Sequence, residues 1–103
     1  GKRNQPDWSD WSHSMAVTAE LLQENMLLHL ILNAYWEPLD FELPPLSAGH
    51  SWRRWIDTAL ETPQDIVPWK TSPAIDVTAY PAQPRSVVVL FGGKNRSERK
   101  PEA

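Results

Sequence analysis

The stretch Leu39-Asp40-Phe41-Glu42-Leu43 alternates strictly between apolar and acidic residues. Because successive side chains of a β-strand point to opposite faces, this alternation predicts a half-buried strand. Two prolines follow directly and end it, since proline has no N–H to donate to a sheet. We interpret the two acidic residues as a solvated strand face rather than as a catalytic pair.

Outward from this stretch, four further segments have strand character. Residues 15–22 and 26–34 resemble two core strands joined by the polar turn 23–25, although helix competes because both segments are rich in good helix formers. Residues 75–80 alternate like a second half-buried strand. Residues 86–91 are β-branched and apolar, which is typical of a strand buried on both faces.

Residues 52–60 are ambiguous. In a helix, one face would carry Trp52, Trp55, Ile56, Ala59 and Leu60, and this spacing slightly favours helix over strand. Residues 61–73 contain three prolines and are expected to form a loop. Pro81 and Pro84 are expected to bracket a turn.

Short runs at this spacing, with turn signals between them, are typical of an all-β sandwich. Residues 15–93 are predicted to form the domain. Residues 1–14 are expected to be an irregular lead-in, in which Trp8 and Trp11 dock on a core or on a neighbouring domain. Residues 94–103 are expected to be a disordered polar tail.

The composition excludes several classes of function. The 103 residues fit one domain, and a formal net charge of −3 without a basic face argues against nucleic-acid binding. There is no cysteine, which fits a reducing cytoplasm and excludes disulfides and thiol chemistry. No apolar run approaches a membrane span. The first Met is Met15, so we expect the chain to begin within a longer protein, and we expect a monomer.

Motifs for catalysis, metals or cofactors are not evident. The three histidines have no metal-ligand spacing, and His29 is expected to be a hydrogen-bonded residue of the core or of a strand edge. Asp57 is expected to form a structural ion pair with Arg53 or Arg54. No metal or cofactor is predicted.

The six tryptophans have two interpretations. Sugars bind by laying apolar ring faces on exposed aromatic rings, so some of these residues are candidate sugar contacts. The competing interpretation is that a small domain uses them to fill its core and its interfaces. The candidates are Trp36, Trp52, Trp55 and Trp69.

Four segments together resemble the last domain of isoamylase-type glycogen-debranching enzymes, members of the α-amylase superfamily. Residues 6–9 (PDWS), with 12–16, resemble the junction into that domain. Residues 33–44 (NAYWEPLDFELP), 52–59 (WRRWIDTA) and 84–90 (PRSVVVL) resemble three of its segments, in the same order. One departure is the turn 23–25, where a glycine is expected.

The resemblance implies an antiparallel β-sandwich of Greek-key type, with about six to eight short strands as in such domains. It also implies that residues 15–34 and 52–60 are strands. The expected partner is a catalytic (β/α)₈ barrel of the same chain that hydrolyses α-1,6 branch linkages in glycogen-like glucans, with Trp8 and Trp11 at the junction. No position matches the family's catalytic motifs, so no catalytic residue is carried over.

Four functions remain open on these grounds. The first is a structural accessory domain with an apolar patch where the barrel packs. The second is a carbohydrate-binding module for α-glucan that lines up two or three exposed Trp rings. The third is a free-standing enzyme, for which the sequence shows no cleft chemistry. The fourth is an immunoglobulin-like interaction domain, which would share the fold.

Overall fold

The computed structural model describes residues 13–93, and within them the fold is all-β, as predicted. The strands, in chain order, are β1 (Ser14–Leu21), β2 (Met26–Asn33), β3 (Leu39–Glu42), β4 (Trp52–Asp57), β5 (Ala74–Ile75), β6 (Ala79–Ala82) and β7 (Ser86–Gly93). One 3₁₀ turn, η1 (Trp69–Thr71), interrupts the long loop between β4 and β5. The described residues include no helix long and apolar enough to span a membrane.

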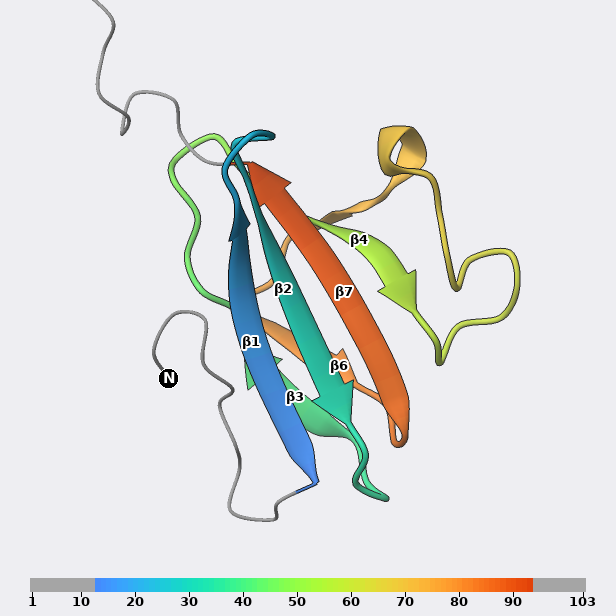
Figure 1. Cartoon of the computed structure of the whole chain (residues 1–103). Helices are drawn as coiled ribbons and strands as arrows, with labels where there is room; N and C mark the ends of the chain where they lie inside the picture. The colour runs from blue at the N-terminus through green and yellow to red at the C-terminus, as the bar shows by residue number, and fades with distance from the viewer. Residues whose placement is uncertain (1–12, 94–103) are drawn as a thin grey trace, which may run out of the picture.

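Two antiparallel sheets form the sandwich. The larger has the order β1-β2-β7-β4-β5, and the smaller pairs β3 with β6. Figure 1 shows β3 and β6 behind β1, β2 and β7, so the small sheet covers one face of the large one. The predicted antiparallel β-sandwich is therefore confirmed.

The β1–β2 hairpin carries the turn at which a glycine was expected. Asn25 occupies the left-handed region with φ 57, and its N–H donates to the Leu22 carbonyl at 3.2 Å. Asparagine tolerates this conformation better than other residues with a Cβ. The turn therefore forms without glycine, and β1 pairs with β2 in unbroken register from Ser14–Asn33 to Leu21–Met26.

The core lies between the two sheets. The inner face of the large sheet supplies Ile31, Val88 and Leu90, and the small sheet supplies Tyr80 and Ala82. Trp52 completes the core, and its indole N–H donates to the Pro44 carbonyl at 2.8 Å. A buried indole needs such an acceptor, because an unpaired N–H in an apolar interior is costly.

His29 also lies in the core, as predicted. It is 3% exposed, bonds Thr18 Oγ1 through Nδ1 at 2.8 Å, and lies against the Trp52 ring. Nε2 has no hydrogen-bond partner among the described residues. Burial lowers the pKa of His29 from 6.5 to about 4, so the ring is neutral at physiological pH.

Residues 52–57 form β4, so the helix that the spacing favoured is wrong and the strand implied by the resemblance is right. A β-bulge explains the misleading pattern. Arg54 pairs with Leu90 and Ile56 with Val89, which leaves Trp55 as one extra residue. Because a bulge breaks the period-2 alternation, the apolar residues on both sides of it have helix-like spacing.

The strand predicted over residues 75–80 is wrong in part. Ala74–Ile75 belong to the large sheet as β5 and Ala79–Ala82 to the small sheet as β6, so the chain crosses between sheets at residues 76–78. Pro81 lies inside β6 instead of opening a turn. The small sheet has two strands, so both are edge strands, and an edge strand tolerates proline.

Candidate functional site: an open apolar sheet face

The outer face of the large sheet is apolar and has no covering layer among the described residues. Strand alternation places the residues between the core positions on this face. Six of them, each half-buried by its neighbours, define what we call the open sheet face: Val17, Leu28, Leu30, Leu32, Val87 and Val89. The prediction that residues 86–91 are buried on both faces is wrong, because Val87 and Val89 retain contact with solvent.

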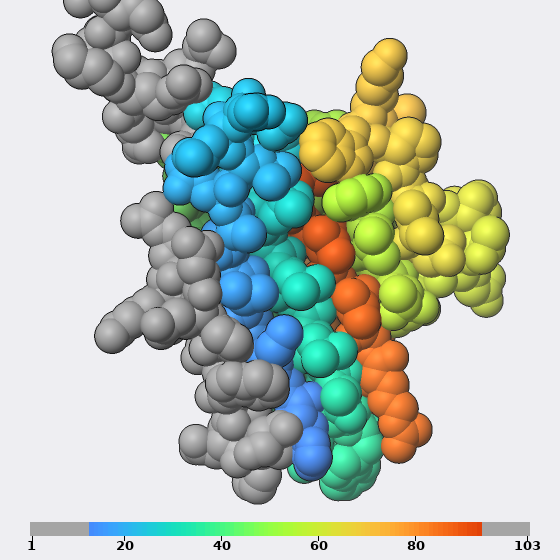
Figure 2. Space-filling view, in the orientation of Figure 1, coloured from blue at the N-terminus to red at the C-terminus, as the bar shows by residue number. Residues whose placement is uncertain are grey.

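Figure 2 views the molecule from this side, with β1, β2 and β7 running side by side at the surface. Contiguous apolar patches on soluble monomers are usually small, and a larger one marks an interaction site. Burial of such a side chain from full exposure contributes about 1.5–3 kcal/mol, and each of these half-buried side chains would gain the remaining part of that amount on complete burial. The open sheet face therefore has the apolar character of an interaction surface.

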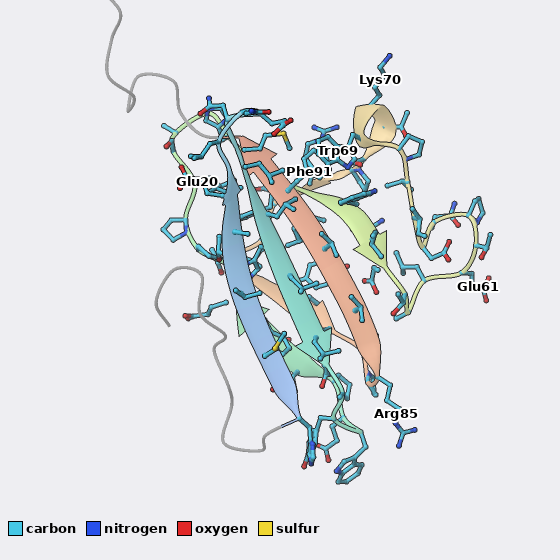
Figure 3. All side chains as sticks on the ribbon, in the orientation of Figure 1. Glu20, Glu61, Trp69, Lys70, Arg85 and Phe91 are labelled. Carbon is cyan, nitrogen blue, oxygen red and sulfur yellow. The ribbon has the colours of Figure 1, made fainter. Side chains whose placement is uncertain are left out.

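An aromatic cluster borders the open sheet face at the β4 side. Trp69 of η1 stacks on Phe91 of β7, and Trp55 of the bulge meets Trp69 edge to face. Figure 3 shows Trp69 lying over Phe91. We call Trp55, Trp69 and Phe91 the aromatic corner.

Hydrogen bonds hold the loop that carries Trp69. The Arg53 guanidinium donates to the Ser72 carbonyl, and the Ser72 hydroxyl donates to the Pro68 carbonyl at 2.9 Å. The Val67 N–H donates to the Trp55 carbonyl at 3.0 Å. These contacts fix η1 against the edge of the sheet, so the aromatic corner extends the open sheet face as an ordered apolar surface.

The predicted sugar contacts are not brought together. Trp52 is 4% exposed and belongs to the core, so its ring has no face for a sugar, and this corrects its place among the candidates. Trp55 and Trp69 are half-buried and their planes stand at 88°. Trp36 is 64% exposed on the loop that follows Asn33, near the opposite end of β7 from Phe91. The described tryptophans therefore form no coplanar platform, and Trp8 and Trp11 lie outside the described residues.

Asn33 organises the end of the sandwich that carries Trp36. Its side chain is fully buried, and Nδ2 lies 3.0 Å from the carbonyl oxygens of Glu37 and Ala82 and 3.1 Å from that of Gln83. Its Oδ1 accepts the Tyr35 N–H at 3.0 Å. One amide thus ties the loop after β2 to the β6–β7 turn. The sequence analysis missed this role, for which the only signal was the position of Asn33 at the start of the segment 33–44.

Asp57, on the inner face of β4, is held by hydrogen bonds within the fold. Asp57 is 4% exposed, accepts the Tyr80 phenol through Oδ2, and accepts the Ala59 N–H through Oδ1 at 3.0 Å. Arg53 bonds a backbone carbonyl. Burial, followed by the hydrogen bond to Asp57, raises the pKa of Tyr80, and Arg54 beside the phenol opposes that rise. Asp57 and Tyr80 are thus hydrogen-bonded to each other within the fold, and an ion pair of Asp57 with Arg54 stays a prediction.

Two further carboxylates lie on the small sheet. Asp40 and Glu42 are exposed on β3, as predicted for a solvated strand face. Within residues 13–93, no group of three or more His, Asp or Glu side chains could hold a metal ion.

Comparison with known protein families identifies a match. The sequence model of the family described as "Isoamylase 1-3, C-terminal" matches residues 1–90. No curated protein matches the chain. The match covers most of the chain and coincides with the segments on which the resemblance rests.

Proposed function

Because the chain belongs to the isoamylase 1-3 C-terminal domain family, we propose that it is a non-catalytic accessory domain whose open sheet face packs on the catalytic barrel of the same chain and stabilises it. A domain of this family is part of a larger isoamylase-type chain, and isoamylases are glycoside hydrolases. We further propose that the parent enzyme hydrolyses α-1,6 branch linkages of glycogen-like glucans in the cytoplasm.

The open sheet face is the observation that carries this proposal. Leu30 and Val89 lie opposite each other at its centre, and both neighbouring strands continue the apolar surface. A sheet packs on another layer through a face of this kind. In water this face is partly hydrated, and a packed layer would bury it. Burial of the apolar side chains would therefore favour the association of the two domains.

The absence of cysteine makes the proposal directly testable. A cysteine at Leu30 would report on the open sheet face, and a cysteine at Asp40, exposed on the small sheet, would serve as the matched control. Each would be labelled with a maleimide in the 103-residue chain and in the intact parent enzyme, and the modified peptide would be measured by mass spectrometry.

In the intact enzyme, we expect labelling at position 30 to slow by roughly tenfold or more, because only local opening would expose a side chain in a packed interface. Labelling at position 40 should proceed at similar rates in both proteins. Equal labelling at position 30 in the two proteins would show that the catalytic domain does not cover this face.

A further inference from the structure

The indole of Trp36 is largely exposed to solvent, although its burial would stabilise the domain. It is 64% exposed, although burial of a large aromatic ring is among the most favourable contributions available to a small domain. Tyr35, the residue before it, is half-buried, and its ring lies beside the indole at a centroid distance of 5.5 Å. Tyr35 also stacks on His13, with ring centroids 6.4 Å apart. The indole therefore has an aromatic support and a free face.

The loop that presents Trp36 is held by buried contacts rather than left loose. Asn33 binds the Tyr35 N–H with its oxygen and the Glu37 carbonyl with its nitrogen, so one side chain clamps the backbone on both sides of Trp36. The Ala34 N–H adds a bond of 2.7 Å to the His13 carbonyl. A recognition residue held in this way loses little conformational entropy when it binds.

The same Asn33 amide brings polar groups to this end of the sandwich. It binds the Gln83 carbonyl, and the turn that follows carries Arg85 in the left-handed region, with φ 55. That conformation is unfavourable for a residue with a Cβ and is kept only where the surroundings impose it. The side chains of Glu37, Gln83 and Arg85 are all exposed. Figure 3 shows Arg85 pointing away from the body of the domain at the β7 start.

We propose that Trp36, together with Glu37, Gln83 and Arg85 on the two loops that Asn33 joins, forms a binding subsite for an α-glucan chain, separate from the open sheet face. An α-linked glucose ring has an apolar C–H face that fits an indole and hydroxyl groups that need donors and acceptors around it. Ligand sites combine aromatic surface with a few polar groups in this way. A protein partner suits the site less well, because three of the exposed side chains on these two loops, Glu37, Gln83 and Arg85, are polar or charged.

The glucan as ligand class rests on the proposed function, since the family is that of glucan-hydrolysing enzymes. The subsite itself rests on geometry, and its test is independent of how the domain packs on the barrel. The subsite would hold a glucan strand on the accessory domain while the parent enzyme acts on a branch elsewhere.

The experiment compares Trp36→Ala, Trp36→Phe and the matched control Ile66→Ala, which removes another exposed apolar side chain from a loop. Each variant of the 103-residue chain would be run in native gels with and without glycogen, and titrated with maltoheptaose by calorimetry. Cellohexaose, which has β-linkages, would test the requirement for an α-glucan. Circular dichroism melting would confirm that each variant is folded.

We expect wild type and Ile66→Ala to be retarded equally by glycogen. Trp36→Ala should weaken binding by about threefold to tenfold, the range that one aromatic contact supplies, and Trp36→Phe should lie between. Equal retardation of wild type and Trp36→Ala, or equal binding of maltoheptaose and cellohexaose, would overturn the proposal.

A different result would assign Trp36 to a protein contact. If Trp36→Ala leaves glycogen retardation unchanged but increases maleimide labelling at position 30 in the intact enzyme, the residue supports the packing of the catalytic domain. That result would reject the subsite and leave the proposed accessory role intact. Conversely, Trp36→Ala could lose glycogen binding while position 30 is labelled equally fast in the 103-residue chain and in the intact enzyme. That result would support the subsite and reject the packing of the open sheet face on the barrel.

Discussion

Trp69 stacks on Phe91 with ring centroids 4.6 Å apart and planes 18° from parallel. The two residues are 22 positions apart in the sequence, and the contact folds the long loop after β4 back over the edge of the large sheet. Phe91 is 6% exposed as a result, although it lies on the outer face.

Removal of the Trp69 ring should therefore destabilise the domain. We expect Trp69→Ala to lower the free energy of unfolding by about 1–3 kcal/mol, because the indole is only half-buried but its loss uncovers Phe91. Urea denaturation followed by circular dichroism would measure the change. Lys70→Ala, on the same turn and exposed, should stay within about 0.5 kcal/mol of wild type. A similar loss in both variants would mean that the turn, not the ring contact, sets the stability.

The hydrogen bond between Tyr80 and Asp57 predicts an effect on stability. Tyr80→Phe keeps the ring in the core but removes the donor to a carboxylate that is 4% exposed. A buried acceptor without its partner costs about 1–3 kcal/mol, and we expect Tyr80→Phe to lose that much at pH 7. An unchanged urea midpoint would show that water replaces the phenol.

The raised pKa of Tyr80 also predicts how the stability of the domain changes at alkaline pH. Its pKa is raised in the fold above the ordinary value of 10, mainly by burial and then by Asp57. The unfolded chain therefore releases this proton first, and the stabilisation present below pH 10 is lost as the pH rises further. Stability measured at a series of pH values above 9 should fall more steeply for wild type than for Tyr80→Phe. Parallel curves would contradict this assignment.

The lowered pKa of His29 predicts that the stability of the domain falls as the pH is lowered into the acidic range. Its pKa is about 4 in the fold against 6.5 when unfolded, so the unfolded chain takes up the proton first as the pH falls. The stabilisation is complete above pH 6.5 and is lost between pH 6.5 and 4, with a total of about 3 kcal/mol. His29→Leu should remove this part of the pH dependence, and NMR titration of the ring would locate the pKa directly. A His29 pKa near 6.5 in the folded chain would refute the prediction.

Replacement of Asn33 would test whether its side-chain amide stabilises the two loops that it joins. Asn33→Asp keeps the acceptor for the Tyr35 N–H but turns an oxygen toward the carbonyls of Glu37, Ala82 and Gln83. Three acceptors would then face a buried carboxylate, which costs about 2–4 kcal/mol more when it is ionised than when it is protonated. Thermal melting at pH 4 and pH 7 should show a larger deficit for Asn33→Asp at pH 7, whereas the deficit of Asn33→Ala should not depend on pH.

Much of the fold could be predicted from local pattern. Residues 39–43 and the segment that became β7 were recognised because their periodicity and β-branched content are properties of the strand itself. The helix-like spacing in residues 52–60 misled because a bulge is a relationship between two strands, and one strand alone does not reveal it. The break at residues 76–78 was missed because the alternation continues while the chain changes sheets.

The candidate site was less accessible to prediction. An apolar run such as residues 86–91 shows that both faces of a strand are apolar, but not whether the same chain covers both. Val87 and Val89 are left open because the small sheet has only two strands and covers only the inner face. The tryptophans were equivalent in composition, and only the fold separates buried Trp52 from exposed Trp36.

The bulge at Trp55 acts as a frame shift within β4. If β4 kept all its residues but paired without a bulge, Trp55 would face Val89, Ile56 would turn inward opposite Val88, and Asp57 would fall opposite Val87 on the outer face. Tyr80 would lose its acceptor, and the open sheet face would gain a charge. Deletion of Trp55, in contrast, would remove the bulge and leave Ile56 opposite Val89 and Asp57 opposite Val88, so the polar and apolar sides of the strand would stay as they are.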